Sequence, residues 1–439
     1  MRLQFRSGIR VTKFLTQPKS KGNEVKSKTS PLMIRMVGLA GIAGMFLAHG
    51  VGIGSRIYTA KLFSNELIRG LGGERAFSVS HAVGSPGYQV QSCTQLSCSK
   101  FPEYAARGIQ SQLSSILWRT PLQNVYVVKK PWNREVRDAM VEFIDYIHGH
   151  YPAVNVVVSE DVADELVHES SGNSRRRGVL YTGLVGDIVS KTDLIVTLGG
   201  DGTILRAVSA FLNVGVPPVL SFAMGTLGFL LPFDFTTYRE SFDMVYLSRA
   251  SALQRTRLEC HVHRRDGERD VTMTYAMNDV SLHRGSQPNL TSLDIVIDGE
   301  FLTTTTADGI VFATPTGSTA YSLSSGGSIA HPLVQCILLT PICPRSLSFR
   351  PLILPILSHI MIRMSELNRN ANIKLNIDGI PQIDLRPGDE MHVVRERAHE
   401  DATVVLGIWC VARNENDWTR DINELLGFNS SFSSKTKRR

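Results

Sequence analysis

Apolar runs alternate with stretches of helical periodicity along the first half of the chain. The short apolar runs have the length of buried strands, whereas the longer stretches repeat their apolar positions every three to four residues. Strands that alternate with helices favour a parallel sheet with crossover helices. We therefore predict an α/β domain with strands at residues 124–128, 154–158, 194–198 and 216–223, and helices at residues 133–148 and 203–212.

The pattern changes after about residue 250, where apolar and polar residues alternate one by one. Such alternation is typical of antiparallel strands with one buried face. It is clear at residues 271–275, 293–297 and 373–384, and two Asp-Gly pairs, at 298–299 and 378–379, mark hairpin turns. This half is predicted to be a β-rich, sandwich-like domain.

These changes divide the chain into successive segments. Residues 75–112 are rich in Ser, Gly and Gln and show no sustained apolar period, which is typical of a linker. The predicted segments are a leader over 1–53, a variable linker over 54–112, an α/β domain over 113–250, a β-rich domain over 251–410, a closing helix over 411–428 and a disordered tail over 429–439.

Length and composition are those of a globular protein of two domains. The chain has 439 residues, of which 43% are hydrophobic and 20% charged. These values exclude a collagen, a coiled coil, a multi-span membrane protein and a wholly disordered chain. The net charge of +7 lies in residues 1–53, which hold nine Lys or Arg and one acidic residue. The rest of the chain is nearly neutral, so the charge indicates no nucleic-acid partner.

The basic leader has the composition of a mitochondrial import sequence, since it is rich in Arg and Ser and poor in acidic residues. A solvated disordered tail is the alternative. An apolar stretch over residues 36–54 is long enough to span a bilayer, but it contains six Gly and one His. We interpret it as a continuation of the leader and expect no stable membrane insertion. A single membrane anchor remains the alternative.

The sharpest chemical signal is Gly199-Gly-Asp-Gly-Thr203, which follows a predicted strand and opens a predicted helix. Gly199, Gly200 and Gly202 let backbone amides approach a phosphate, and the helix N-terminus adds a favourable field. A carboxylate beside phosphates needs a metal or a proton-transfer role, so Asp201 is either a Mg²⁺-organising residue or a general base. A tight turn capped by Asp201 is the alternative. The chain has no GxxxxGK[ST] motif, which excludes a P-loop NTPase.

Two further motifs lie in the β-rich half. In residues 308–327 a strand runs into a loop dense with Ser, Thr and Gly, which can offer amides and hydroxyls to a polar ligand, while Tyr321 can stack on a base or ribose. Asn278 and Asp279 place an amide beside a carboxylate, a pair that suits ribose hydroxyls or an amide, although turn capping explains it equally well. His283, in the same motif, is interpreted as structural.

With these motifs the chain resembles the NAD kinase family, which phosphorylates the adenosine-ribose 2′-hydroxyl of NAD(H). The resemblance implies a homo-oligomer and an α/β domain followed by a β-rich domain, with a C-terminal segment that returns to the first domain. It covers residues 113–428 and includes 199–203, 222–230, 253–258, 278–279, 308–327, 331–332 and 344–351. Ala223, where many members have Asn, and the basic leader are similar to the branch of fungal mitochondrial NADH kinases.

The resemblance also implies roles for single residues. Asp201 matches the catalytic aspartate, and Gly202 follows it in the nucleotide-binding pair. Asp279 stands where Glu is more common, so its side chain reaches less far. The other implied binding residues are Asn278 and Asp279 for the substrate NAD, Asp308 for a nucleobase or nicotinamide amide, and Thr319, Ala320, Tyr321 and Ser324 for the adenosine pocket.

The implied reaction is phosphoryl transfer from Mg·ATP to a ribose hydroxyl of NADH or NAD in the mitochondrial matrix. Gly199, Gly200, Gly202 and Thr203 would cradle the phosphates, and Arg206 is either a phosphate contact or part of a solvated helix face. Mg²⁺ offsets the charge of the triphosphate, and no protein ligand is assigned to it. The alternatives are a diacylglycerol- or sphingosine-type lipid kinase with the same loop, and a dinucleotide sensor with weak turnover. The sequence does not distinguish NADH from NAD.

Overall fold

A computed structural model describes residues 87–108, 111–169, 177–211, 214–225, 228–265, 274–366, 368–397 and 406–427. All of these residues belong to one compact unit, Phe77–Arg439. The predicted leader over 1–53, the apolar stretch over 36–54 and the tail over 429–439 lie outside the described residues. No helix in the described ranges is long and apolar enough to cross a membrane.

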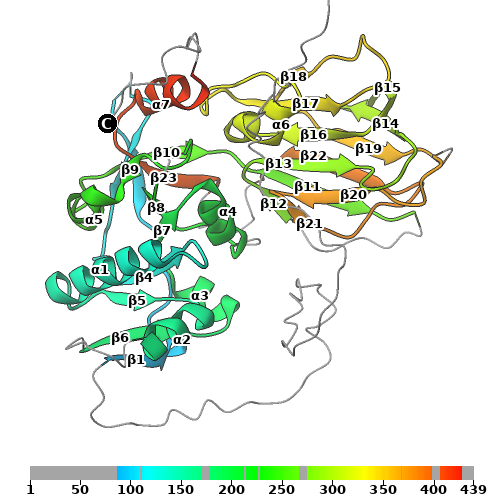
Figure 1. Ribbon diagram of the computed structural model, residues 1–439. Coiled ribbons are helices and arrows are strands. Elements are labelled where there is room, and N and C mark those ends of the chain that lie inside the picture. Colours follow the sequence, from blue (N-terminus) through cyan, green and yellow to red (C-terminus); the bar gives the residue numbers. More distant parts are fainter. Residues whose placement is uncertain are drawn as a thin grey trace, which may run out of the picture. The chain divides into compact units, whose positions relative to one another are not determined.

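A large mixed sheet forms the first domain (Figure 1). Six of its strands are parallel, as predicted, and run in the order β1-β6-β5-β4-β7-β8. Their bounds are β1 Gly87–Ser92, β4 Asn124–Lys129, β5 Asn155–Val157, β6 Arg177–Thr182, β7 Leu194–Gly199 and β8 Val219–Ala223, with the short β9 Phe233–Asp234 paired to β8.

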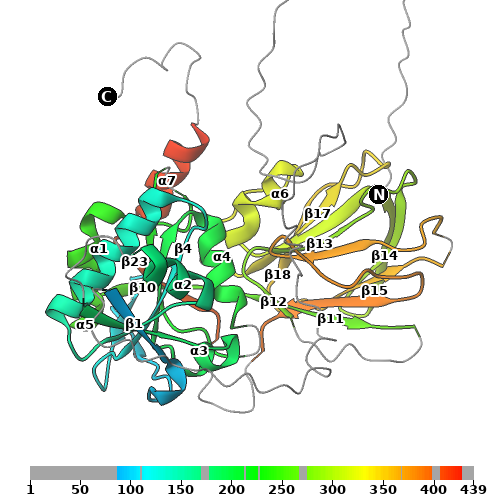
Figure 2. The same cartoon turned by 60° about the horizontal axis from the view of Figure 1, so that its bottom comes forward.

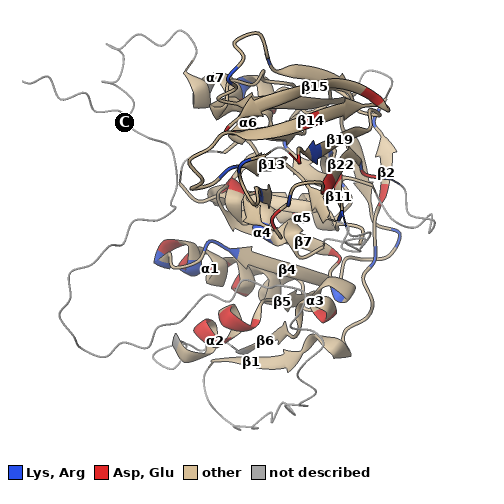
Figure 3. Ribbon diagram, turned by 90° about the vertical axis from the view of Figure 1, so that its right-hand side faces the viewer, with Lys and Arg blue, Asp and Glu red and all other residues tan. Residues whose placement is uncertain are grey.

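Helices cover both faces of this sheet, because alternate strand residues are apolar on each side. Val125 and Val127 of β4 pack in one core with the helices α1 and α5, whereas Val128 packs in another core with α4. Lys, Arg, Asp and Glu lie on the helices α1 and α2, and few lie on the strands beneath them (Figure 3). The helix bounds are α1 Arg134–His150, α2 Glu160–Glu169, α3 Val185–Lys191, α4 Asp201–Ser209 and α5 Tyr238–Tyr246, with the 3-10 turns η2 Cys93–Gln95 and η4 Phe235–Thr237.

The sheet continues with strands from distant parts of the chain. β23 (Ile408–Ala412) pairs in parallel with β8. β10 (Ser251–Arg255), β3 (Ser114–Leu117) and β2 (Glu103–Ala106) then follow, each antiparallel to the strand before it. The C-terminal segment therefore returns to the first domain, as the resemblance implies (Figure 2). The predicted boundary at 250 separates β10 from the sheet in which it pairs.

The prediction of a linker over 54–112 is wrong for two segments of that range, which form the strands β1 and β2. β1 and β2 form the two edges of the large sheet. Most of their side chains are exposed or half-buried, so an edge strand of this kind shows no apolar period. Their place in the sheet comes from backbone pairing with β6 and β3, which the composition does not reveal.

Two antiparallel sheets of six strands form the second domain and share one apolar core, as the sandwich-like prediction requires. We call them the second sheet and the third sheet. The second sheet has the order β12-β11-β22-β19-β14-β15, with β11 Leu258–His263, β12 Thr274–Ala276, β14 Thr291–Ile297, β15 Glu300–Ala307, β19 Ile360–Met364 and β22 Glu390–Arg395. The third has the order β18-β17-β16-β13-β20-β21, with β13 Asp279–His283, β16 Gly309–Ala313, β17 Cys336–Ile342, β18 Leu352–Pro355, β20 Lys374–Ile377 and β21 Ile380–Pro381.

Both predicted Asp-Gly hairpin turns are confirmed. Asp298 and Gly299 join β14 to β15, and Asp378 and Gly379 join β20 to β21. All four residues have positive φ, which a two-residue turn of this type requires. The remaining elements are the turn η5 Thr316–Thr319 and the helices α6 Tyr321–Ser324 and α7 Asp417–Leu426.

Candidate active site

The glycine-rich loop lies where β7 ends and α4 begins. A Cβ on Gly199 would lie 2.2 Å from Thr203 Oγ1, so only glycine lets the chain turn this tightly. The Gly200 amide donates a hydrogen bond to Thr203 Oγ1 at 3.3 Å. Gly202 is exposed on the first turn of α4, where free backbone amides can bind a phosphate.

Asp201 is held by a second loop 28 residues further along the chain. Its Oδ2 accepts a hydrogen bond from the Phe229 amide at 3.2 Å, and its Oδ1 accepts one from the Leu230 amide at 3.1 Å. Gly228 makes this approach possible, because a Cβ there would lie 2.2 Å from Asp201 Oδ1. Burial raises the pKa of Asp201, and the two amides and Arg255 oppose that rise. The carboxylate is thus fixed in place and is a better proton acceptor than a solvated aspartate.

Arg255 of β10 connects this region to the β-rich domain. The side chain is buried, and it donates to Phe229 O at 3.4 Å and to Thr316 Oγ1 at 3.2 Å. Its positive charge also lowers the pKa of Asp201. One guanidinium therefore ties the loop that holds Asp201 to the Ser/Thr/Gly loop that starts at Thr314.

Asn278 and Asp279 lie at the turn between β12 and β13 and are buried. The Asp378 carboxylate accepts three backbone hydrogen bonds at this turn, from the amides of Met277 (2.8 Å), Asn278 (2.7 Å) and Asp279 (3.1 Å). Burial and the nearby Asp378 raise the pKa of Asp279 to about 7. Burial also raises the pKa of Asp378, and its three amide donors and Arg257 oppose that rise. Asp279 has no such donors against its burial, so it takes up the proton near neutral pH.

The Ser/Thr/Gly loop packs directly on this turn. Thr314 donates from its amide to Asn278 O at 2.9 Å and from its hydroxyl to Met277 O at 2.6 Å. Gly317 approaches so closely that a Cβ would lie 2.0 Å from Asn278 O. The dense run of small residues is therefore explained by contact with the Asn278–Asp279 turn, as well as by ligand binding.

Tyr321 begins α6 and is 37% exposed, so its ring is available to a ligand. Burial raises the pKa of its phenol, and the carboxylates of Asp279 and Asp308 raise it further. Both predicted carboxylates therefore act electrostatically on the predicted Tyr321. Arg284 Nε donates to Asp308 Oδ1 at 2.5 Å, which fixes that carboxylate.

The other predicted residues lie around these contacts. Thr319 and Ala320 are half-buried between η5 and α6, and Ser324 is exposed at the end of α6. Arg206 is exposed, and its guanidinium lies 3.8 Å from Asp161 Oδ2 of α2. His283 Nδ1 accepts a hydrogen bond from the Gly285 amide, which agrees with its interpretation as structural.

Three residues of this region were not singled out from the sequence, namely Gly228, Arg255 and Asp378. Gly228 and Arg255 stand in runs that carry the family resemblance, at residues 222–230 and 253–258. The sequence therefore marked these two segments, but it did not indicate what either residue does. Asp378 was interpreted as a turn residue only. Its capture of three amides depends on contact with a segment about 100 residues earlier in the chain.

The raised pKa of Asp279 makes a prediction for stability against pH. An aspartate with a folded pKa of about 7 favours folding most at low pH, and that contribution is lost as pH rises from about 4 to about 7. Asp279→Asn removes the buried charge, so we expect it to be more stable than wild type at pH 8 and equally stable at pH 4. The gain in the free energy of unfolding at pH 8 should exceed about 1 kcal/mol, since each tenfold change in a proton-binding constant corresponds to about 1.4 kcal/mol. Urea unfolding at both pH values measures it, and a gain independent of pH would contradict the assignment.

Comparisons with known proteins match both domains in order. Residues 125–249 match the ATP-NAD kinase N-terminal domain, and residues 277–405 match the ATP-NAD kinase C-terminal domain. The chain is 56% identical over 350 residues to the mitochondrial NADH kinase POS5 of Saccharomyces cerevisiae, covering 73% of this chain and 84% of that one. It is 38% identical over 333 residues to the mitochondrial NADH kinase pos5 of Schizosaccharomyces pombe, covering 75% and 81% of the two chains.

A solved structure extends these matches to three dimensions. The crystal structure of yeast NADH kinase complexed with NADH has a TM-score of 0.73 and 55% sequence identity to this chain. It covers 80% of this chain and 99% of the solved one. Fold and site together define a nucleotide-dependent phosphotransferase. The chain belongs to the ATP-NAD kinase family and is an NAD(H) kinase. The family, fold class and enzyme class predicted from the sequence are confirmed, and the lipid-kinase alternative is excluded.

Proposed function

We propose that the chain transfers the γ-phosphoryl group of Mg·ATP to the 2′-hydroxyl on the adenosine ribose of NADH, in preference to NAD. The bond from the 2′-oxygen to γ-phosphorus forms, the bond from γ-phosphorus to the ADP oxygen breaks, and Asp201 accepts the hydroxyl proton. The observation that carries the proposal is the fixed Asp201 carboxylate at the start of α4, connected through Arg255 to the loop that leads to Tyr321.

The donor phosphates would lie at the N-terminus of α4. Gly199, Gly200, Gly202 and Thr203 stand there, and a helix N-terminus favours anions. ATP enters as its Mg²⁺ complex, in which the metal offsets part of the triphosphate charge. Both Asp201 oxygens accept backbone hydrogen bonds, which suits a positioned base better than a metal ligand. Arg206 would reach a phosphate only by leaving Asp161.

The dinucleotide would bind along the second cluster, formed by Asn278, Asp279, Asp308 and Tyr321. Asp308 accepts a hydrogen bond from Arg284 and can accept another from an amide or an exocyclic amine. Thr319, Ala320 and Ser324 would line the adenosine part beside the Tyr321 ring. Catalysis would then consist of positioning and charge stabilisation, as is usual for phosphoryl transfer.

Substrate preference is tested by kcat/KM for NADH and for NAD, measured on the purified chain with Mg·ATP. A higher kcat/KM for NADH supports the preference, and equal values would contradict it. The yeast relatives support this choice, since one is a mitochondrial NADH kinase and the solved yeast NADH kinase is complexed with NADH. Failure to phosphorylate either dinucleotide would instead favour the sensor alternative.

Tyr321→Ala tests the dinucleotide pocket. We expect KM for NADH to rise and KM for ATP to change less, because the ring would stack on the dinucleotide rather than on the donor. Loss of base stacking costs about 1–3 kcal/mol, so the rise should be roughly tenfold or more. Steady-state kinetics with each substrate varied in turn measures it. Tyr321→Phe keeps the ring and should retain most of the affinity. An unchanged KM for NADH in Tyr321→Ala would remove Tyr321 from the site.

We further propose that the enzyme acts in the mitochondrial matrix as a homo-oligomer. The basic residues 1–53 and the mitochondrial relatives support the location. Deletion of residues 1–53 should leave an active enzyme in the cytosol, which fractionation and activity assays would detect. A truncated chain that still enters mitochondria would contradict the role of the leader. Gel filtration with light scattering tests the oligomer.

A further inference from the structure

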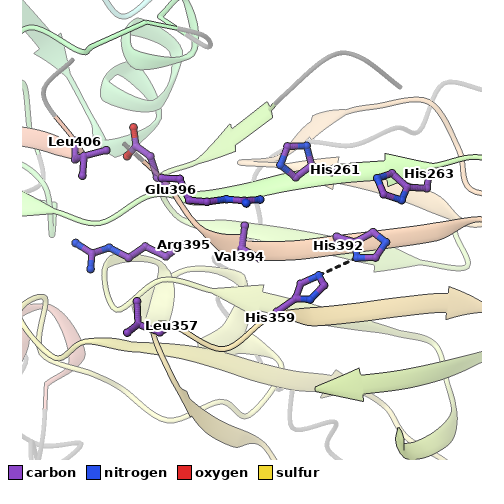
Figure 4. A pocket seen from close by; sticks show the side chains of 10 residues that line it. His261, His263, Leu357, His359, His392, Val394, Arg395, Glu396 and Leu406 are labelled. Carbon is purple, nitrogen blue, oxygen red and sulfur yellow. Dashed lines mark hydrogen bonds between the residues drawn. The ribbon is translucent and has the colours of Figure 1, made fainter. Parts of the chain in front are cut away.

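A group of histidines lies on the second sheet, on the face turned away from the core. Along β11 the residues Leu258, Cys260 and Val262 face the core, so His261 and His263 alternate to the other side. The register pairs His261 with His392 and His263 with Glu390, which places all four residues on this face. His359 precedes β19 by one residue and lies next to His392 (Figure 4). The histidines line a depression of about 740 Å³.

Within the described part of the chain, one group of three His, Cys, Asp or Glu side chains could hold a metal ion, because their ligand atoms all lie within 4.8 Å of one another. The group consists of His263, Glu390 and His392. The His263 and His392 rings have their centroids 4.5 Å apart. His392 Nε2 lies 3.6 Å from Glu390 Oε2. Two ligands of a tetrahedral zinc ion are about 3.3 Å apart, given metal–ligand distances near 2.0–2.1 Å. A small rotation of His263, which is exposed, closes the remaining distance.

The ring of His392 is oriented by a hydrogen bond at its other nitrogen. His392 Nδ1 and His359 Nε2 are 2.9 Å apart, so one of them donates to the other. His392 Nε2 is buried and has no hydrogen-bond partner among the described residues. The nearest acceptor, Glu390 Oε2, lies 3.6 Å away, beyond ordinary hydrogen-bond distance, so a proton on Nε2 would be poorly satisfied. His392 therefore donates from Nδ1, and its Nε2 lone pair points toward Glu390 and His263.

Glu390 is oriented in the same way. Arg363 donates to Glu390 Oε1 from Nε at 2.9 Å and also from its terminal nitrogen. The contact with His392 is made by the other oxygen, Oε2. A lone pair on His392 Nε2 and a carboxylate oxygen repel each other unless a proton or a metal ion lies between them.

We propose that His263, Glu390 and His392 form a binding site for a divalent transition-metal ion such as Zn²⁺. Two imidazoles and one carboxylate are a ligand set that zinc accepts, and the open depression leaves a fourth position for water. Hydrogen bonds from outer residues, here His359 and Arg363, are typical of metal ligands. The ion would join β11 to β22 on the surface of the β-rich domain and would stabilise that domain.

The test is titration of the purified full chain with Zn²⁺ in competition with a chromophoric chelator. The exposed thiols of Cys98 and Cys343 can also bind zinc, so both are replaced by Ser in every variant. We expect one bound Zn²⁺ per chain and a melting temperature that rises with Zn²⁺. His263→Gln should raise the Kd by at least about tenfold and abolish the rise in melting temperature. His263 is exposed, so this variant should fold normally.

Two further variants make the test specific. His261→Gln alters a neighbouring histidine on the same strand and face that is engaged with Glu259, and it should bind Zn²⁺ as the parent does. His359→Gln keeps an acceptor for His392 Nδ1, and it should bind Zn²⁺ more tightly than His359→Ala does. Equal affinity of the parent and His263→Gln would overturn the proposal. So would failure of the parent to bind Zn²⁺ at submillimolar concentration, or an equal loss in His261→Gln.

Discussion

Replacement of Asp201 by Asn should lower kcat by at least about 100-fold, because general-base assistance typically contributes 10²–10⁴-fold. The amide of Asn cannot accept the proton of the ribose hydroxyl. Burial already raises the pKa of Asp201, so the carboxylate accepts a proton more readily than a solvated one. NADH binding, measured by calorimetry, should persist because the dinucleotide contacts lie in the second cluster.

The structure adds a cost in stability to this substitution. Asp201 accepts hydrogen bonds from both Phe229 and Leu230, whereas Asn has one oxygen to offer. One amide then loses its acceptor, and we expect the free energy of unfolding to fall by about 1–3 kcal/mol. The assay must therefore be run well below the melting temperature of the variant, with circular dichroism as the check on folding.

Asp138→Asn is the matched control for the loss of one carboxylate. Asp138 lies on α1 with its side chain 62% exposed and pairs with the adjacent Arg137. It should retain wild-type kcat and stability. If Asp201→Asn loses stability but keeps near wild-type kcat, Asp201 anchors the loop at Gly228–Leu230 and is not the base.

The second large effect is expected from Asp378→Ala. The substitution removes the acceptor of three backbone amides at Met277, Asn278 and Asp279. Each amide left without a partner in a buried place costs about 1–3 kcal/mol, so the free energy of unfolding should fall by roughly 3 kcal/mol or more. KM for NADH should rise as well, because the Asn278–Asp279 turn loses its support. Urea unfolding and steady-state kinetics measure the two effects.

Asp298→Ala is a close control, since Asp298 occupies the same position in the other Asp-Gly hairpin turn. Both aspartates have positive φ, so both variants carry the same backbone cost. Asp298 is exposed, and its carboxylate accepts a backbone hydrogen bond from His359 at 2.8 Å. The loss of stability should be clearly smaller than in Asp378→Ala, and KM for NADH should not change. Equal losses in the two variants would assign the effect to the turn alone.

Asp378 also affects the protonation of Asp279. After burial, the charge of Asp378 is the second cause that raises the pKa of Asp279. In Asp378→Asn the turn keeps one acceptor oxygen and loses that charge. The pKa of Asp279 should then move down toward its ordinary value, and the pH range over which the protein loses stability should move down with it.

The sequence by itself determined the features that depend on neighbouring residues. Strand β7, the glycine loop and α4 follow one another within sixteen residues, so apolar pattern and glycine spacing predict them together. The Asp-Gly turns at 298–299 and 378–379 were predicted for the same reason, because turn geometry is set by the two residues themselves. The ordered motifs further identified the family, since each is a local run of residues.

Only the tertiary structure decided which distant segments meet. Asp201 meets Phe229 across 28 positions, Arg255 meets Thr316 across 61, and Asp378 meets Asn278 across 100. Local periodicity states which face of a strand is apolar, but it does not state which strand lies beside it. The edge strands β1 and β2 were missed for this reason, and the alternating His261, His263 and His392 became a cluster only through the pairing of β11 with β22. Strand register and loop-to-loop hydrogen bonds, which depend on the packed core, therefore completed the site.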